Sequence, residues 1–220
     1  MTGAVFEDRT DAGRQLGEVL KTKDIPNPLV VAIPRGGVPV GVQIARALSC
    51  PLKLVVLRKL FIPSEPEAGF GAMAPDGTVL VDHEWVAQLG LSTADVDAVV
   101  RQVRAELRRR RALYPCVSAE DVRDRDVILT DDGIAAGYSM CAAARYVGGL
   151  QPRSLRVAVP CAPAGSLERI RPLVQEIVCL VPSKRLPFAV AGFYRHWHDL
   201  TDREVQAFLA ARTPHRGGNP

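Results

Sequence analysis

One unit recurs along this chain and constrains its fold more than any other feature: a short apolar run, a loop of small residues, and a segment of helix-forming composition. The unit is most complete at residues 126–139, whose sequence is DVILTDDGIAAGYS. Residues 127–129 predict one buried strand, and residues 140–146 have the composition of a helix. Buried strands that alternate with helices predict an α/β fold, in which a mostly parallel, twisted sheet is flanked by helices.

Further copies of the unit predict the other strands of this sheet. Their apolar runs lie at residues 29–33, 52–57, 155–159 and 176–181. The first run leads into Arg35-Gly36-Gly37 and a helix, the second into Arg58-Lys59, and the third into a loop at residues 160–165. Because ligands bind beyond the carboxyl ends of such strands, we expect these loops and the acidic loop after residue 129 to meet at one edge.

Between and after these units the pattern changes. Residues 60–68 contain two prolines and predict a long loop, whereas residues 70–74 and 78–81 predict a hairpin. Residues 83–113 are the longest helical stretch, with a capping box that begins at Ser92. We expect one domain over residues 1–213, with a helical insertion at about 83–113, a C-terminal hood at about 182–200 and a disordered tail at 214–220.

Composition narrows the class of protein. Hydrophobic residues make up 47% of the 220, which suffices for a packed core, and the formal charge of +4 is mild. No apolar run approaches the roughly 20 residues of a membrane span, and the first 23 residues are polar rather than leader-like. The five cysteines show no C-x-x-C spacing. We expect a soluble, cytoplasmic protein with its thiols reduced, and no membrane partner.

The loops that are predicted to meet carry complementary chemistry. Asp131 and Asp132 can accept hydrogen bonds from paired hydroxyls such as those of a ribose. The small residues 135–139 can cradle a phosphate with backbone N–H groups at the start of a helix. Cationic side chains, from Arg35, Arg58 and Lys59, can grip a second anionic group. A ribose with a phosphate at one end and a pyrophosphate at the other satisfies all three features.

Residues 127–139 resemble the phosphoribosyl diphosphate signature of the type I phosphoribosyltransferases: an apolar strand, two acids and a small loop ending in Gly-x-Thr/Ser. Residues 33–37 (IPRGG) resemble the pyrophosphate loop of that fold, and residues 57–71 (LRKLFIPSEPEAGFG) resemble the entry to its mobile catalytic loop. The order of these pieces is similar to a branch of predicted bacterial phosphoribosyltransferases of undefined acceptor, over roughly residues 5–210. The resemblance implies that fold, with a small cap or hood subdomain.

It also implies an activity. A phosphoribosyltransferase, a pentosyltransferase of nucleotide metabolism, uses phosphoribosyl diphosphate and Mg²⁺ to transfer ribose 5-phosphate to a nitrogenous, nucleobase-like acceptor, with release of pyrophosphate. Catalytic roles fall on Arg58, Lys59, Asp131 and Asp132, and the two acids could also contact the metal through water. Substrate binding is implied for the remaining positions: Arg35, Gly36 and Gly37 at the pyrophosphate, and Ala135, Ala136, Gly137, Tyr138 and Ser139 at the 5′-phosphate.

Three positions depart from the family pattern. Ala136 replaces a threonine that would contact the phosphate, Tyr138 stands where small residues are common, and Ala135 replaces the acid of the hypoxanthine and guanine enzymes. These departures leave open a non-catalytic sensor of phosphoribosyl diphosphate or nucleotides on the same fold. The acceptor is not predicted, and a homodimer is one candidate assembly because relatives on this fold are often dimers.

Two other segments have alternative interpretations. The arginines at residues 101–111 could bind nucleic acid, but they lie on an amphipathic helix without interleaved aromatics, so a solvated face is favoured. His196-Trp197-His198 could line an acceptor pocket or form a cap that packs on the core.

Overall fold

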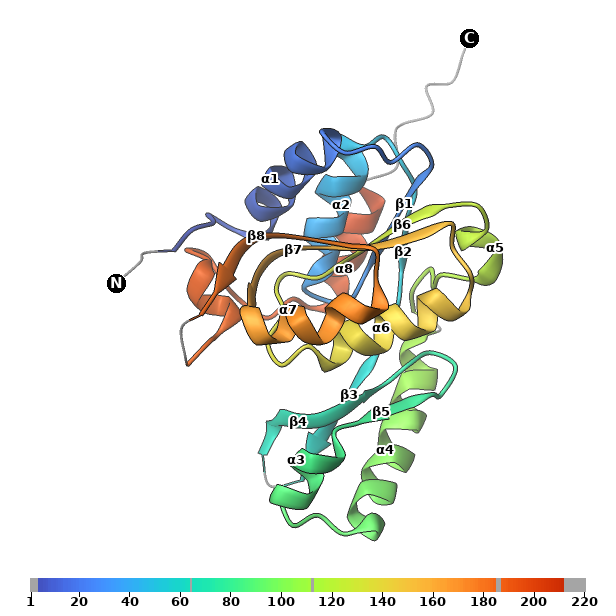
Figure 1. Cartoon of the computed structure of the whole chain (residues 1–220), viewed down its shortest axis with the longest axis vertical. Coiled ribbons are helices and arrows are strands. Elements are labelled where there is room, and N and C mark those ends of the chain that lie inside the picture. The colour runs from blue at the N-terminus through green and yellow to red at the C-terminus, as the bar shows by residue number, and fades with distance from the viewer. Residues whose placement is uncertain (1–3, 64, 112, 185–186, 212–220) are drawn as a thin grey trace.

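A five-stranded parallel sheet forms the centre of the protein in a computed structural model, which describes residues 4–63, 65–111, 113–184 and 187–211 (Figure 1). The strand order is β2-β1-β6-β7-β8, and neighbouring strands are parallel throughout. The strands are β1 (Pro28–Ala32), β2 (Leu52–Leu54), β6 (Asp126–Thr130), β7 (Ser154–Pro163) and β8 (Glu176–Ser183). The predicted α/β fold with a mostly parallel sheet is confirmed.

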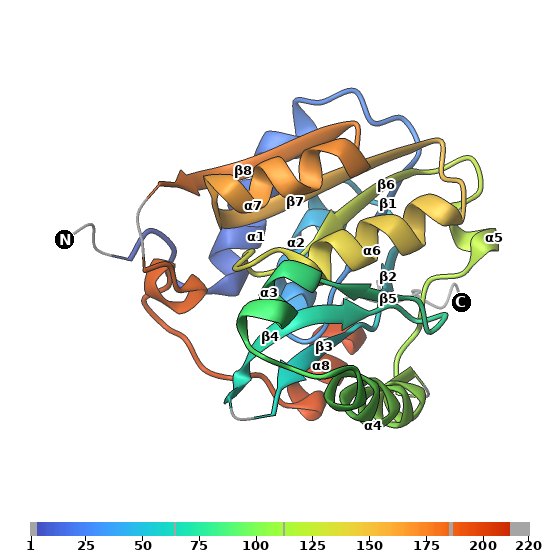
Figure 2. The same cartoon turned by 60° about the horizontal axis from the view of Figure 1, so that its bottom comes forward.

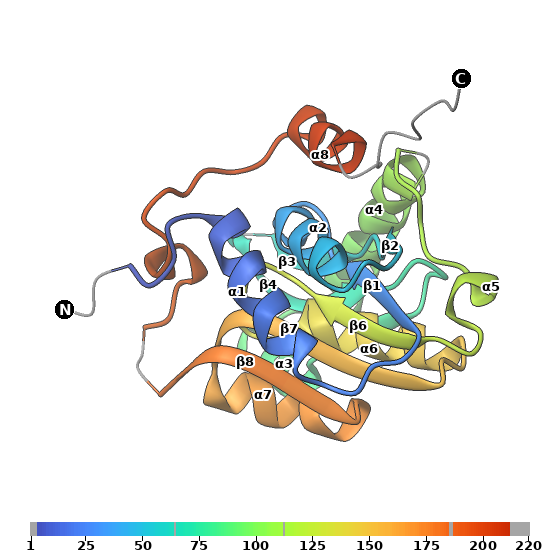
Figure 3. The ribbon, with the colours of Figure 1, turned by 90° about the horizontal axis from the view of Figure 1, so that it is seen from above.

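Helices cover both faces of this sheet (Figure 3). Helices α1 (Arg9–Lys21) and α2 (Gly37–Ala47) lie on one face, and α6 (Tyr138–Gly149) and α7 (Ala164–Ile170) lie on the other. In β1, Val30 and Ala32 pack toward α1 and α2, whereas Leu29 and Val31 pack toward α6. Alternate residues are thus buried on opposite faces, which is why these strands are continuous apolar runs.

The strand order reverses between β1 and β6. From β1 the chain goes to the edge strand β2, and β6 returns to the opposite side of β1. Ala32 of β1 pairs with Thr130 of β6, so the loops that follow both strands begin at the same level. Such a reversal leaves a crevice beyond the strand ends, where ligands bind in open α/β sheets.

A second, smaller layer lies against α6 (Figure 2). It is a three-stranded antiparallel sheet of β3 (Arg58–Ile62), β4 (Glu65–Met73) and β5 (Val79–Val81), followed by helices α3 (His83–Gln88) and α4 (Thr93–Arg111). Leu60 and Phe70 of this sheet pack against Val103 and Leu107 of α4, and Ala72 belongs to the core cluster on α6. We call these three strands the hairpin layer.

The hairpin layer corrects the prediction of a long loop at residues 60–68. Strands β3 and β4 occupy the segment on both sides of Pro63, and only Ser64 lies outside the described residues. Register shifts at Leu60/Phe61 and Phe61/Ile62 break the strand period that sequence reasoning looks for. Pro66 lies in β4 before the part that pairs with β5, where its missing N–H is tolerated.

Two smaller predictions also fail. The strand predicted at residues 52–57 ends at Leu54, and the loop predicted at residues 160–165 is wrong because β7 continues through Pro163. β6 pairs with β7 only as far as Ala158, so Pro160 lies beyond that ladder and its missing N–H removes no hydrogen bond between the two strands.

The remaining elements complete the chain. They are α5 (Ala119–Val122), which was not predicted, the short turns η1 (Arg171–Leu173) and η2 (Val190–Phe193), and α8 (Asp202–Ala210). The predicted capping box at Ser92 is confirmed, Thr201 and Glu204 form a further capping box at the start of α8, and Asp8 caps α1. The predicted tail at 214–220 lies outside the described residues. In the described part of the chain, no helix has the length and apolar character to cross a membrane.

Candidate active site

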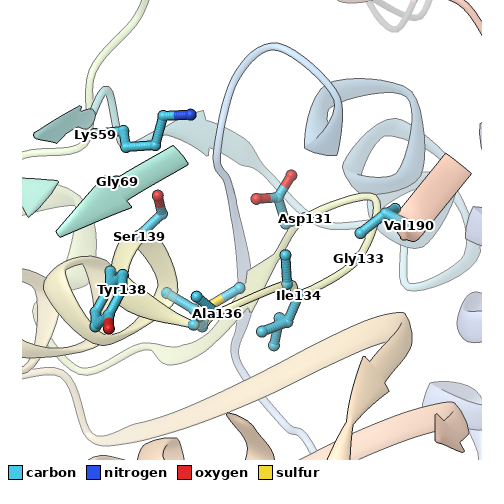
Figure 4. Close-up of a pocket in the computed structure, with 12 residues that line it drawn as sticks. Lys59, Gly69, Asp131, Gly133, Ile134, Ala136, Tyr138, Ser139 and Val190 are labelled. Carbon is cyan, nitrogen blue, oxygen red and sulfur yellow. The ribbon is translucent and has the colours of Figure 1, made fainter. Parts of the chain in front are cut away.

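A pocket of about 450 Å³ lies at the carboxyl end of β6 (Figure 4). The loop at residues 131–139 forms its floor, Lys59 and Gly69 of the hairpin layer form one side, and Val190 of η2 closes another. The pocket therefore joins seven of the predicted site residues: Lys59, Asp131, Ala135, Ala136, Gly137, Tyr138 and Ser139.

The small-residue loop is fastened from its outer side. Ser166 Oγ donates to the Ala135 carbonyl at 2.6 Å, and the Arg169 guanidinium donates to the Ala136 carbonyl at 3.2 Å. Gly137 then turns the chain with φ of +90°, which a glycine adopts without strain, and N-caps α6 without a side-chain hydrogen bond. With these carbonyls held outside, the first N–H groups of the twelve-residue helix α6 are left to bind an anion at its positive end.

Gly36 and Gly37 bring the loop after β1 into contact with the two acids. A Cβ on Gly36 would lie 2.0 Å from Asp132 Oδ2, and a Cβ on Gly37 would lie 2.8 Å from Asp131 Cα. No side chain fits at either position, so the two glycines are required for the strand ends to approach this closely. The peptide bond between Pro34 and Arg35 is cis.

The two acids have different surroundings. Asp131 lines the pocket and accepts a hydrogen bond from the Asp132 N–H at 2.9 Å. Asp132 instead turns its carboxylate to Arg9 Nε, at 2.7 Å, and to the backbone of Gly36. Burial, and then the neighbouring charge of Asp132, raise the pKa of Asp131 well above its ordinary value. Burial also raises the pKa of Asp132, against the opposing effect of the Arg9 charge.

Arg58 and Lys59, which the sequence predicts to act at the same site, have different surroundings in the structure. Successive residues of a strand point to opposite faces, and in β3 Lys59 faces the pocket while Arg58 forms an ion pair with Glu106 of α4. The stem of Lys59 passes over Gly69, where a Cβ would lie 2.5 Å from its Cγ. Arg35 lies just before α2, and its guanidinium has no hydrogen bond or ion pair to the rest of the described chain.

Tyr138 connects the site to the hairpin layer. Its ring lines the pocket, but its hydroxyl points away from Lys59 and Asp131 (Figure 4) and donates to Asp82 Oδ2, at the cap of α3, at 2.7 Å. The Arg169 guanidinium lies 4.9 Å from the ring centroid. Tyr138, one of the three residues that depart from the pattern described above, therefore connects α6 to the start of α3.

Sequence reasoning missed the residues behind the acids. Arg9 is buried although it begins a helix, and the Tyr194 hydroxyl donates to the Asp132 carbonyl. Trp197 stacks on Arg9 and on Tyr194, which supports the interpretation of this segment as a cap on the core. His196 and His198 lie exposed beside Glu7 and Glu204. The one feature of the sequence that could have pointed to this support is Arg9 itself, an arginine directly after the helix-capping Asp8.

The chain is similar in sequence to known phosphoribosyl transferases. Residues 10–193 match the family described as phosphoribosyl transferase domain. Two curated Mycobacterium tuberculosis proteins, MT0597 of strain CDC 1551 and Rv0571c of strain H37Rv, each named "Putative phosphoribosyl transferase", are 36% identical over 208 residues. The match covers 93% of this chain and 46% of theirs, so the chain spans about half their length.

Two solved structures share the fold. The crystal structure of TT1426 from Thermus thermophilus has a TM-score of 0.74 and 33% identity, covering 95% of this chain and 99% of that one. The AQ2163 protein of Aquifex aeolicus, at 13% identity and a TM-score of 0.50, covers 81% of this chain and 76% of that one.

Proposed function

Since the chain belongs to the phosphoribosyl transferase domain family, we propose that it is an enzyme that uses phosphoribosyl diphosphate and Mg²⁺ to transfer ribose 5-phosphate to a nitrogenous, nucleobase-like acceptor. The observation that carries the proposal is the loop at residues 135–139. Its carbonyls are held outward by Ser166 and Arg169, its amides start α6, and it adjoins the carboxylate of Asp131 in one pocket. That arrangement supports a 5′-phosphate beside a ribose.

In the proposed reaction, an acceptor nitrogen forms a bond to the anomeric carbon of the ribose. The bond from that carbon to the pyrophosphate oxygen breaks, and its electron pair leaves with pyrophosphate. Positive charge develops on the ribose and negative charge on the leaving group, so cations near the latter stabilise the transition state. Lys59 lines the pocket and Arg35 follows β1, and both are proposed to bind the pyrophosphate.

The residues at this site fit a magnesium ion. Mg²⁺ is usually held by one or two carboxylates, waters and substrate phosphate oxygens rather than by a full protein cage. The described residues contain no group of three or more His, Cys, Asp or Glu side chains placed to hold a metal, but Asp131 offers one carboxylate in the pocket. When bound, the ion would neutralise charge on the pyrophosphate oxygens. Asp131 would hold it through water while accepting from the ribose hydroxyls.

The acceptor is proposed to enter from the side of the C-terminal hood. Val190 of η2 belongs to the hood and lines the pocket beside Gly133. An apolar side chain at this point suits the face of a flat, nucleobase-like acceptor. Ala135 offers no acid–base group, so the proton of the attacking nitrogen would pass to water rather than to that residue.

A sensor that binds phosphoribosyl diphosphate without turnover is the alternative, favoured by the missing hydroxyl at Ala136 and the missing acid at Ala135. One experiment separates the two. The protein is titrated calorimetrically with phosphoribosyl diphosphate and Mg²⁺, and pyrophosphate release is then assayed with a panel of nucleobases. We expect binding and release with at least one base, and loss of both in the Asp131→Asn/Asp132→Asn variant. Binding without release for every base supports the sensor, and undiminished binding by the double variant refutes the site.

A further inference from the structure

Arg9 is a charged side chain held where none is expected. It is the first residue of α1, yet its side chain is only 8% exposed. Its Nε donates to Asp132 Oδ2 at 2.7 Å, and another guanidinium nitrogen donates to the His198 carbonyl at 2.9 Å. The centroid of the Trp197 ring lies 3.7 Å from the guanidinium carbon. The hydrogen bonds hold the edge of the guanidinium and the Trp197 ring covers its face, a pair of contacts that a lysine ammonium could not make.

The partners of Arg9 come from segments far apart in the sequence. The His198 carbonyl and Trp197 belong to the C-terminal segment, which is fixed to the start of the chain by hydrogen bonds from Arg195 and His196 to the backbone of Phe6 and Glu7. The ring of Tyr194 stacks between Phe6 and Trp197 while its hydroxyl donates to the Asp132 carbonyl. Residues 6–9 and residues 194–198 thus converge on Asp132.

The contact with Arg9 offsets the cost of burying the Asp132 carboxylate. This carboxylate is only 14% exposed, so burial disfavours its ionisation and raises its pKa. Arg9 supplies the compensating charge at hydrogen-bond distance. The carboxylate also lies against Gly36, in space where a Cβ would be 2.0 Å from Oδ2. The Asp132 carboxylate is therefore held between the Arg9 guanidinium and the backbone of Gly36.

We propose that Arg9 is a positioning residue of the phosphoribosyl site: it fixes the carboxylate of Asp132 between α1 and Gly36, and the Asp132 N–H in turn holds the Asp131 carboxylate toward the ribose hydroxyls. Arg9 itself touches neither the pocket nor the reacting atoms. The inference rests on the proposed function, because it assumes that a ribose 5-phosphate group is bound. It also gives residues 194–198 a role as the outer support of Arg9.

Two variants separate the charge of Arg9 from its bulk. Arg9→Met keeps an unbranched apolar stem, and Arg9→Lys keeps the positive charge. The control is Arg14→Met on the same helix, because Arg14 is 71% exposed and pairs only with Asp11 among the described residues. Binding of ribose 5-phosphate and of inorganic pyrophosphate, each with Mg²⁺, is measured by calorimetry.

Loss of a charge-assisted hydrogen bond predicts that Arg9→Met weakens ribose 5-phosphate binding about tenfold or more, while Arg9→Lys weakens it about threefold. Pyrophosphate affinity stays within about twofold of wild type in all variants, since pyrophosphate is proposed to bind Lys59 and Arg35 directly and to reach Asp131 only through the metal and its water. Equal loss for both ligands, equal loss in the methionine and lysine variants, or no loss overturns the proposal.

A wild type that binds neither ligand refutes the proposed function, whereas a wild type that binds both with an unaffected Arg9→Met variant refutes only the role of Arg9. If Arg9→Met does not fold, Trp197→Leu replaces it, because this change removes the stacked ring and leaves the charge. It is expected to weaken ribose 5-phosphate binding about threefold, as loss of a cation–π contact predicts. Unchanged binding by that folded variant overturns the proposal.

Discussion

Strand β6 carries an aspartate at its amino end and another just past its carboxyl end, and the two have opposite environments. Asp126 is buried under hydrogen bonds from Arg153, Ser154 Oγ and the Asn27 N–H. The Arg153 hydrogen bond is the main reason that its pKa is held far below the ordinary value of 3.8. Asp131 has a pKa raised well above that value, by burial and by the charge of Asp132.

The difference distinguishes a structural acid from a candidate functional one. At the amino end of β6, every strong acceptor direction of the carboxylate is used by the protein, so Asp126 fastens β6 to its neighbours. At the carboxyl end, Asp131 faces a pocket and accepts from the neighbouring Asp132 N–H. A buried carboxylate with a raised pKa in a cleft is typical of a ligand-binding or catalytic site.

The largest effect on ligand binding is expected from removing the charge of Asp131 at the carboxyl end of β6, compared with removing the charge of Asp126 at its amino end. Asp131→Asn should weaken phosphoribosyl diphosphate binding about 100-fold, since several charge-assisted hydrogen bonds are lost together. Asp126→Asn is the matched control and should leave that affinity within about twofold, because it lies a full strand away. Calorimetric titration measures both. Equal losses in the two variants would mean that the two ends do not differ in function.

A smaller effect on binding tests whether the hairpin layer contributes Lys59 to the pocket at the carboxyl end of β6. Lys59→Met should weaken pyrophosphate and phosphoribosyl diphosphate binding about tenfold, as loss of one charge-assisted contact predicts. Arg58→Met removes the neighbouring cation, which pairs with Glu106, and should leave affinity nearly unchanged while lowering thermal stability. If Arg58→Met weakens binding more than Lys59→Met does, Arg58 and not Lys59 binds the pyrophosphate.

The smallest effect on binding, and the clearest on stability, is expected at Asp126. Asp126→Asn should lower the free energy of unfolding by about 1–2 kcal/mol near neutral pH, at the low end for charged hydrogen bonds because Arg153 is partly exposed. A carboxyl whose pKa is lowered by folding stabilises above its unfolded value of 3.8 and loses that contribution as pH falls toward the folded value. The stability gap between wild type and variant should therefore narrow as pH falls below about 4.

Urea unfolding of both proteins at pH 7, 5 and 3 measures this gap. Asp97→Asn, on an exposed position of α4, is the control and should show little change at any pH. A gap that stays constant down to pH 3 would show that Asp126 does not stabilise the fold through its charge.

Local sequence was enough to predict the elements that lie in the parallel sheet. The acidic loop, the two glycines after β1 and the helix after residue 137 all follow from short apolar runs and small residues, whose effect is local. Seven of the predicted site residues line one pocket, although their roles remain predictions. The hairpin layer was misjudged because its register shifts and prolines remove the strand period from the sequence.

The parallel α/β core and the loop that starts α6 follow from local sequence, because burial on two faces and glycine geometry act over a few residues. Which side chains face the candidate site depends on contacts between distant parts of the chain. The fold separates Lys59 from Arg58 on opposite faces of one strand, and it places Arg9 between Asp132 and Trp197. It also shifts the pKa values of Asp126 and Asp131 in opposite directions, since the pKa of a carboxyl is set by its three-dimensional neighbours and not by its position along the chain.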